Sequence, residues 1–170
     1  MDLKQVIRTI PDFPEKGILF RDITTVLHNP IALKEAVDQV AEKLSGIEFD
    51  LVVGPESRGF IFGMPIAYNL GKGFIPVRKA GKLPYETVKK NYALEYGTAT
   101  IEMHTDAVAP GQRVVIIDDL LATGGTSKAI AELIEEVGGI VAHMSFFIEL
   151  RTLGGRNLLK NYDLSSIINY

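Results

Sequence analysis

The chain has 170 residues, of which 46% are hydrophobic and 23% charged, the composition of one ordinary globular domain. Its net charge of -3 argues against a nucleic-acid binder that depends on a broad basic face. The absence of cysteine excludes disulfide scaffolds, zinc–thiolate sites and cysteine nucleophiles. No apolar run approaches the roughly 18–20 residues of a membrane span. We therefore expect a cytoplasmic protein that binds neither nucleic acid nor membrane.

Two helices are predicted before residue 50. A short amphipathic helix that stops at Pro11 is indicated by the apolar residues Leu3, Val6, Ile7 and Ile10. Asn29 followed by Pro30 is a capping side chain and then a proline at the first helical position. One apolar face follows, and Ser45-Gly46 predicts the end of this second helix.

The middle of the chain predicts short buried strands and one long excursion. Apolar runs at 50–53 and 74–77 predict strands on either side of a helix over 59–70. From 78 to 96 the hydrophobic periodicity fails, and the segment contains five lysine or arginine residues. A loop of this length inside a compact domain is usually functional, which favours a lid. Alternation over 98–103 predicts a strand that returns from it.

The clearest unit follows. A β-branched run at 113–117 predicts a strand that ends at Asp118-Asp119, and a helix begins after 123–126. Gly138-Gly139 stops that helix before another strand over 140–150. Strand, helix and strand in this order predict a right-handed parallel crossover. The predicted fold class is α/β, with a mainly parallel, doubly wound sheet in a single domain over 1–170.

The string VVIIDDLLATGGT at 114–126 carries the strongest chemical signal. Ligands of open α/β sheets lie beyond the carboxyl ends of strands, where ionised carboxylates accept hydrogen bonds from sugar hydroxyls. Glycines and a helix N-terminus present backbone amides to an anion. A capped strand-to-helix turn is the alternative interpretation, but the full string favours a ribose 5-phosphate pocket. It is not a Walker loop, because G-x-x-x-x-G-K-[ST] is absent from the chain.

This string resembles the phosphoribosyl pyrophosphate motif of the type I phosphoribosyltransferases. Further segments resemble the adenine phosphoribosyltransferase branch, in order from about Ile10 to Arg156. Glu56 stands where many members have aspartate, and Ala80 stands where a basic residue is common. The matching segments are FPEKGILFRDIT at 13–24, ESRGF at 56–60, RKAGKLP at 78–84 and LEYG at 94–97.

The resemblance implies a purine-salvage transferase that condenses adenine with phosphoribosyl pyrophosphate to give AMP and pyrophosphate. An oxocarbenium-like transition state is expected, with Mg²⁺ carried on the pyrophosphate of the substrate. The three histidines show no ligand spacing, so we expect no metal-binding residues of the protein itself. The family also implies a homodimer.

Roles follow residue by residue from the same resemblance. Asp118 and Asp119 are expected to hold the ribose hydroxyls, while Ser57 and Arg58 meet the pyrophosphate. Arg58 also has a catalytic role, because it neutralises charge on the leaving group. The 5-phosphate is expected to be held by Ala122, Thr123, Gly124, Gly125 and Thr126.

A lid loop over 78–97 is expected to be mobile and to close on the pyrophosphate. Lys82 would act there as a catalytic cation, with Arg78 and Lys79 as further ligands. Glu95 is the candidate for taking the proton that the purine nitrogen loses. A solvated charged loop is the alternative for each of these residues.

The first 30 residues are expected to form a hood segment that recognises the base. Phe20 would stack on one face of adenine and Leu120 on the other, because a purine offers a broad π surface. Backbone groups of Leu19 and Arg21 could read the 6-amino group and the N1 acceptor. A core phenylalanine is the alternative for Phe20.

Three rival functions remain open at this level. The same fold could act on another purine, such as hypoxanthine or xanthine. A regulator without enzymatic activity could use the pocket to sense phosphoribosyl pyrophosphate, although it would not need the lid residues Lys82 and Glu95. A generic nucleotide-binding module is the third, and the ordered set of matching segments disfavours it.

Overall fold

The computed structural model describes residues 1–93 and 97–170. Contacts divide the chain into two compact units, Met1–Gln39 and Val40–Tyr170. The prediction of one domain, with a hood over 1–30 and a lid over 78–97, remains a prediction. Across the described ranges, every helix is too short or too polar to span a membrane.

The smaller unit is built around a two-stranded antiparallel ribbon. After helix α1 (Leu3–Val6), strand β1 (Arg8–Pro11) pairs with β2 (Leu19–Asp22), and α2 (Thr24–Leu27) follows. The prediction of a helix up to Pro11 is therefore wrong beyond Val6. A residue before proline is pushed out of the helical region, and the ribbon uses the extended conformation of that segment.

Helix α3 (Pro30–Leu44) confirms its predicted start and end. The side chain of Asn29 accepts hydrogen bonds from the backbone N–H groups of Ile31 and Ala32, each at 3.1 Å. These bonds satisfy two of the donors that a helix start leaves open. Beyond Leu44, Gly46 adopts a left-handed φ of 86°, which suits a residue without a β-carbon.

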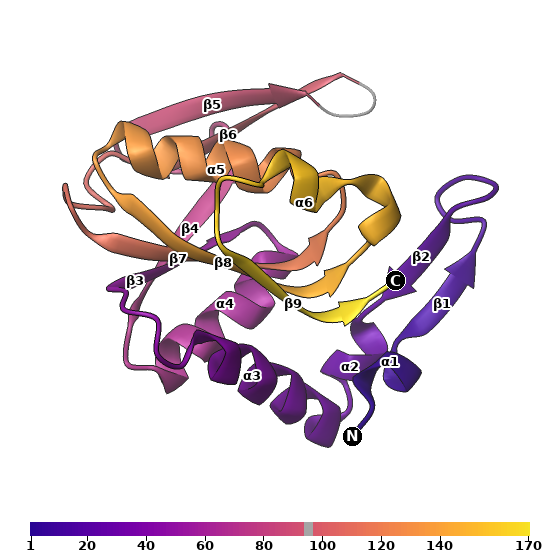
Figure 1. Cartoon of the computed structure of the whole chain (residues 1–170). Helices are drawn as coiled ribbons and strands as arrows, with labels where there is room; N and C mark the ends of the chain where they lie inside the picture. The colour runs from indigo at the N-terminus through magenta and orange to yellow at the C-terminus, as the bar shows by residue number, and fades with distance from the viewer. Residues whose placement is uncertain (94–96) are drawn as a thin grey trace. The chain divides into compact units, whose positions relative to one another are not determined.

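The larger unit contains a mixed sheet in the order β5-β6-β4-β3-β7-β8-β9 over its described residues. The neighbours from β4 to β9 are parallel, while β6 and β5 are antiparallel (Figure 1). The strands are β3 (Leu51–Pro55), β4 (Gly73–Lys79), β5 (Thr87–Ala93), β6 (Thr98–His104), β7 (Arg113–Leu121), β8 (Ile140–Glu149) and β9 (Leu164–Asn169).

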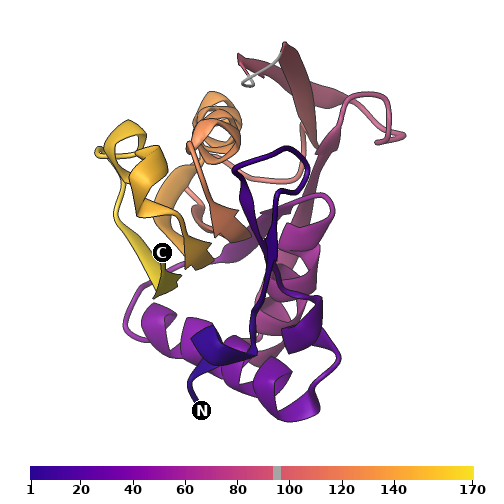
Figure 2. The same ribbon diagram turned by 90° about the vertical axis from the view of Figure 1, so that its right-hand side faces the viewer.

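Helices lie on opposite faces of the parallel strands. Helix α4 (Arg58–Asn69) packs on β3, β4 and β7, whereas α5 (Gly125–Glu136) covers the other face and contacts β5 (Figures 1 and 2). Burial on both faces explains why the central strands read as continuous apolar runs. Val114 to Ile117 are all fully buried, as are Ile130, Leu133 and Ile134 of α5. The doubly wound α/β class is confirmed.

Three features of the larger unit differ from the predictions. The expected loop from 78 contains the end of β4 and all of β5, which pairs with β6 as a hairpin. Strand β7 continues through Asp118-Asp119 to Leu121, because β8 pairs with it over that whole length. Strand β9 was not predicted, and a 3₁₀ turn (Arg151–Leu153) and the short helix α6 (Gly155–Leu158) precede it.

Candidate active site

The site-bearing edge of the sheet is a point where the chain connections diverge. Strand β3 leads through α4 to β4 on one side, and β7 leads through α5 to β8 on the other. Because β3 and β7 are adjacent and parallel, their two strand-to-helix turns lie at the same edge. Open α/β sheets bind ligands at such switch points.

The loop between β7 and α5 encloses a small pocket of about 80 Å³. Gly124 adopts a left-handed φ of 84° and precedes the first residue of α5. Backbone amides at a helix N-terminus, together with its partial positive charge, suit an anion. The residues that line the pocket are Asp118, Leu120, Leu121, Ala122, Thr123, Gly124, Gly125, Thr126 and Ser127.

Two carboxylates precede this loop. Asp119 is buried, and its backbone N–H donates to Oδ1 of Asp118 at 2.8 Å. Burial raises the pKa of Asp118 well above its ordinary value, and the charge of Asp119 adds to the shift. Burial also raises the pKa of Asp119, although the nearby Arg58 guanidinium opposes the shift. Hydrogen bonds donated by a polar ligand would favour the ionised form of this pair.

Arg58 connects the two strand-to-helix turns. It begins α4, and its Nε lies 3.0 Å from Oδ2 of Asp119. Its side chain is 43% exposed. Ser57 precedes it at the helix start, and the Glu56-Ser57 peptide bond is cis. The structure thus brings the predicted Ser57–Arg58 segment to the predicted carboxylates.

Glu56 holds two of the predicted cations. Arg78 Nε donates to one carboxylate oxygen of Glu56 at 2.7 Å, and Lys82 Nζ donates to the other at 2.8 Å. Burial of Glu56 opposes ionisation, but these hydrogen bonds outweigh it and lower the pKa of the carboxyl. Sequence reasoning noted Glu56 only as a departure from the family pattern. Its partners are 22 and 26 residues away, which no local pattern indicates.

Glu102 is a further residue that sequence reasoning missed. It lies on β6 and is buried, and its Oε1 accepts from the backbone N–H groups of Lys82 and Leu83, each at 2.9 Å. Its burial raises the pKa, but the backbone donors of Leu83, Gly81 and Lys82 prevail and lower it. One glutamate in an alternating strand gives no sequence signal for this anchoring role.

The other lid candidates are placed less fully. Lys79 is the exposed last residue of β4. Glu95 lies outside the described residues. The end of β5 approaches the loop between β7 and α5: a β-carbon added to Gly125 would lie 3.5 Å from the Ala93 carbonyl oxygen and 3.7 Å from the Tyr92 ring.

The base-recognition candidates fall in both units. Leu19, Phe20 and Arg21 lie on β2 of the smaller unit, and Leu120 lies on β7 of the larger one. The Phe20 ring meets the edge of Phe13 with a centroid distance of 5.2 Å. Arg21 Nη1 donates to the Thr9 hydroxyl at 2.6 Å. The stacking of adenine between Phe20 and Leu120 stays a prediction.

No group of three or more histidine, aspartate or glutamate side chains is arranged to hold a metal ion within residues 1–93 and 97–170. His104 lies beside Tyr85, and His143 Nε2 is 2.9 Å from the Ser165 hydroxyl. Both histidines thus have neighbours in the structure that account for them.

Known proteins share this sequence and fold. The family model described as "Phosphoribosyl transferase domain" matches residues 22–166. The adenine phosphoribosyltransferase of Lachnoclostridium phytofermentans is 63% identical over 168 residues, which cover 99% of this chain and 97% of that protein. The crystal structure of adenine phosphoribosyltransferase from Thermoanaerobacter pseudethanolicus is 55% identical with a TM-score of 0.97, covering 99% of this chain and 98% of that one.

A more distant structure gives the same result. The Saccharomyces cerevisiae adenine phosphoribosyltransferase, crystallised with an imino-altritol bisphosphate and adenine, is 40% identical with a TM-score of 0.91. The match covers 97% of this chain and 96% of that one. The family match, the identities and the shared fold agree with the divergent edge, the paired aspartates and the amide loop. The chain belongs to the phosphoribosyltransferase family, in its adenine phosphoribosyltransferase branch.

Proposed function

We propose that this chain transfers the phosphoribosyl group of phosphoribosyl pyrophosphate to adenine in purine salvage, giving AMP and pyrophosphate. The observation that carries the proposal is the arrangement of Asp118, Asp119 and the 122–126 amide loop beside Arg58. It offers acceptors for sugar hydroxyls, donors for a phosphate and a fixed cation for a leaving group. Relatives at 63% and 55% identity carry the name of this activity.

The reaction breaks the bond between the ribose anomeric carbon and the pyrophosphate oxygen, and a purine nitrogen forms a new bond to that carbon. The leaving oxygen takes the bonding electron pair, so positive charge develops on the ribose in an oxocarbenium-like transition state. Arg58 and Lys82 are proposed to stabilise the departing pyrophosphate, with Ser57, Arg78 and Lys79 as further ligands. Glu95 is proposed to accept the proton that the purine nitrogen releases.

For Lys82 and Arg78 to reach the pyrophosphate, they must exchange Glu56 for the ligand. The side chains of Lys82 and Arg78 are partly exposed, at 49% and 35%, so they can turn toward a ligand, whereas the Glu56 side chain is only 9% exposed. A pyrophosphate with several negative charges competes well against one carboxylate. Glu56 is therefore proposed to keep the two cations in place until the substrate arrives.

A Mg²⁺ ion is proposed to enter with the pyrophosphate of the substrate, as the family resemblance implies. Bound to the pyrophosphate oxygens, Mg²⁺ would neutralise part of the leaving-group charge. Asp118 and Asp119 remain available for the ribose hydroxyls. Phe20 and Leu120 are proposed to enclose the adenine ring, with Leu19 and Arg21 reading its edge through their backbone groups.

Pyrophosphate-coupled turnover tests the proposal. The protein is assayed with phosphoribosyl pyrophosphate and Mg²⁺ plus adenine, hypoxanthine, guanine or xanthine in separate reactions. We expect signal with adenine and AMP as the product. Turnover with an oxopurine in place of adenine would keep the reaction class but overturn the base assignment. Binding of phosphoribosyl pyrophosphate without turnover on any base would support a sensor instead.

A homodimer and a cytoplasmic location are the remaining parts of the proposal, and both rest on the family resemblance. Light scattering on the purified chain tests the first. A dimer has twice the 18.7 kDa mass of one chain. A mass of 18.7 kDa at assay concentration would contradict it.

A further inference from the structure

The phosphate loop, as we name the proposed phosphate site at 122–126, rests against a backbone segment that no motif in the loop predicts. Gly155, the first residue of α6, lies so close to the loop that a β-carbon added there would be 2.4 Å from the Ala122 carbonyl oxygen. From the other side, a β-carbon added to Gly124 would be 3.0 Å from the Gly155 carbonyl oxygen. Two glycines thus allow backbone to pack directly on backbone behind the amides that face the phosphate.

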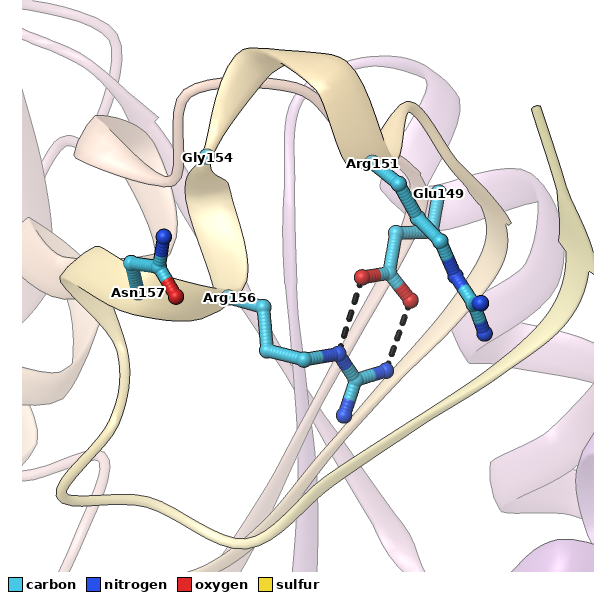
Figure 3. Close-up of a pocket in the computed structure, with 5 residues that line it drawn as sticks. All are labelled: Glu149, Arg151, Gly154, Arg156 and Asn157. Atoms are coloured by element: carbon cyan, nitrogen blue, oxygen red, sulfur yellow. Dashed lines mark hydrogen bonds and ion pairs between the residues drawn. The ribbon is translucent and has the colours of Figure 1, made fainter.

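An ion pair fixes the residue that follows Gly155. Arg156 Nε donates to Oε1 of Glu149 at 2.9 Å, and its Nη2 donates to Oε2 at 2.6 Å (Figure 3). The Glu149 side chain is only 2% exposed. The Arg156 hydrogen bonds lower the pKa of Glu149 most, so the carboxyl is ionised at neutral pH. A two-bond arginine–carboxylate pair sets orientation as well as distance.

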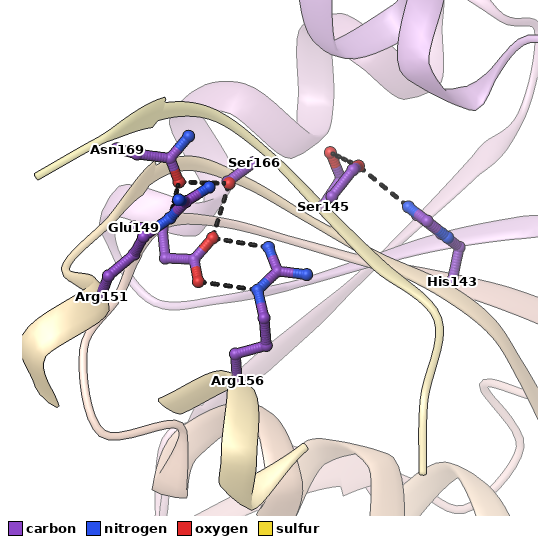
Figure 4. A network of polar contacts seen from close by, with 8 residues as sticks. His143, Ser145, Glu149, Arg151, Arg156, Ser166 and Asn169 are labelled. Atoms are coloured by element: carbon purple, nitrogen blue, oxygen red, sulfur yellow. Dashed lines mark hydrogen bonds and ion pairs between the residues drawn. The ribbon is translucent and has the colours of Figure 1, made fainter. Parts of the chain in front are cut away.

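Glu149 is itself held at a defined place. It ends β8, where it lies opposite Leu121, the residue before Ala122. The Ser166 hydroxyl on β9 donates to its Oε2 at 2.6 Å (Figure 4). The Glu149 carboxylate therefore cannot readily follow Arg156 if that side chain moves.

These contacts close a ring around the start of the phosphate loop. The ring runs from Leu121 across the sheet to Glu149, through the ion pair to Arg156, along the chain to Gly155, and back to Ala122. The ring also borders a pocket of about 470 Å³ lined by Glu149, Arg151, Gly154, Arg156 and Asn157. One side of α6 borders this open space, while Leu159 just after α6 is buried in the core. The ion pair is thus one of two restraints that keep Gly155 on the loop.

We propose that Glu149 and Arg156 are positioning residues for the 5-phosphate of the substrate. They hold Gly155 against Ala122 and Gly124, and so fix the backbone amides that receive the phosphate. The inference rests on the proposed function only in taking the 122–126 loop as the phosphate site. Amides cannot be re-aimed by rotating a side chain, so their accuracy depends on what supports the backbone.

The first test compares Arg156→Lys with Arg151→Lys as its matched control. Lysine keeps the charge but loses the two-bond geometry, and Arg151 contacts Asn169 rather than Glu149. Isothermal titration calorimetry with ribose 5-phosphate and with pyrophosphate separates the two subsites. In Arg156→Lys we expect about tenfold weaker binding of ribose 5-phosphate, less than the roughly hundredfold that a 1 Å misplacement can cost. Pyrophosphate binding should be unchanged, and Arg151→Lys should behave as the wild type with both ligands.

Glu149→Gln provides a second route to the same result, since it removes the charge from the other partner. Unchanged ribose 5-phosphate binding in either folded variant overturns the proposal, even if the melting temperature falls. So does equal weakening of pyrophosphate, which would mean a general loss of structure. Failure of the proposed function looks different: the wild type would bind ribose 5-phosphate but release no pyrophosphate with adenine.

Discussion

Lys82 illustrates how one residue can be held in two ways at once. Its ammonium group donates to Glu56, while its backbone N–H donates to Glu102. The Lys82 side chain is half exposed, so its ammonium group can turn to a ligand, whereas its backbone N–H donates to a buried carboxylate. The backbone of Lys82 is thus fixed while its ammonium group can change partner, which suits a cation that must bind an incoming anion.

Removing this cation should weaken the phosphoribosyl pyrophosphate site specifically. In Lys82→Gln we expect the KM for phosphoribosyl pyrophosphate to rise about tenfold, the equivalent of one charge-assisted hydrogen bond. The KM for adenine should change less. The free energy of unfolding should fall by less than about 1 kcal/mol, because Lys82 is half exposed and Arg78 still pairs with Glu56. Steady-state kinetics and denaturant unfolding measure both.

Lys90→Gln is the matched control, because Lys90 lies on the same hairpin and pairs with Glu132 of α5 at 3.0 Å. It should leave both KM values unchanged. If Lys82→Gln retains the wild-type KM for phosphoribosyl pyrophosphate, Lys82 does not bind the leaving group.

At the residue scale, the sequence predicted the part of the candidate site that surrounds Asp118 and Asp119. Asp118, Asp119 and the 122–126 loop are contiguous, so one string reports them all, and the structure brings Arg58 to them. Glu56 and Glu102 act on residues about 20 positions away in sequence, through contacts that exist only after the sheet has formed. A single sequence carries no pattern for such partners.

Among the elements, strand β6 holds the turn at 82–83 through Glu102. The carboxylate accepts two N–H groups from the turn at 82–83, and Lys89 on β5 lies 3.6 Å from its other oxygen. A leucine at position 102 would leave both N–H groups without that acceptor. A glutamine keeps an acceptor oxygen and loses only the charge.

We therefore expect Glu102→Leu to lower the free energy of unfolding by about 2 kcal/mol, and Glu102→Gln by less than about 1 kcal/mol. Because the turn positions Lys82, Glu102→Leu should also raise the KM for phosphoribosyl pyrophosphate more than that for adenine. Urea unfolding and kinetics on both variants are the measurements. Equal effects of leucine and glutamine would mean that charge, not the acceptor position, is what the turn needs.

The helices and strands differ in how well a sequence predicts them. The unit from β7 through α5 to β8 is predicted because its strands are buried on both faces and glycine pairs mark its turns. Strand β5 is missed because it is an edge strand, in which exposed Lys89 and Asn91 interrupt the apolar pattern. Strand β9 is also an edge, and its Ser165-Ser166 pair lowers its hydrophobicity.

Across the whole molecule, the buried carboxyl groups act on stability in opposite directions. Glu102 and Glu149 have lowered pKa values, so their stabilising contribution is present at neutral pH and is lost as pH falls through the folded-state pKa. Asp118 and Asp119 have raised pKa values, so they destabilise the fold once pH rises above the unfolded-state value. At neutral pH, Glu102 and Glu149 thus stabilise the fold, whereas Asp118 and Asp119 destabilise it.

Replacing Asp118 should therefore lower the activity and raise the stability of the protein. In Asp118→Asn, the amide oxygen can still accept the Asp119 N–H, but the charge and its repulsion are gone. We expect the melting temperature at neutral pH to rise by about 2–4 °C, the shift that 1 kcal/mol gives in a domain of this size. Turnover should fall by about tenfold, because the ribose loses one hydrogen bond to a charged group.

The pH dependence of this difference separates the electrostatic cause from a packing effect. Below the ordinary aspartate value of 3.8 both the folded and the unfolded carboxyl are protonated, so the variant and the wild type should melt alike. As pH rises above that value, the unfolded carboxyl ionises while the folded one keeps its proton, so the wild type loses stability that the asparagine variant keeps. The gap should widen until the folded-state pKa is passed. Melting curves at a series of pH values above 3.8 follow this rise. Asp106→Asn, at an exposed loop position, is the control and should show no gap. A gap of constant size at all pH values would show that the stabilisation comes from packing and that Asp118 carries no buried charge.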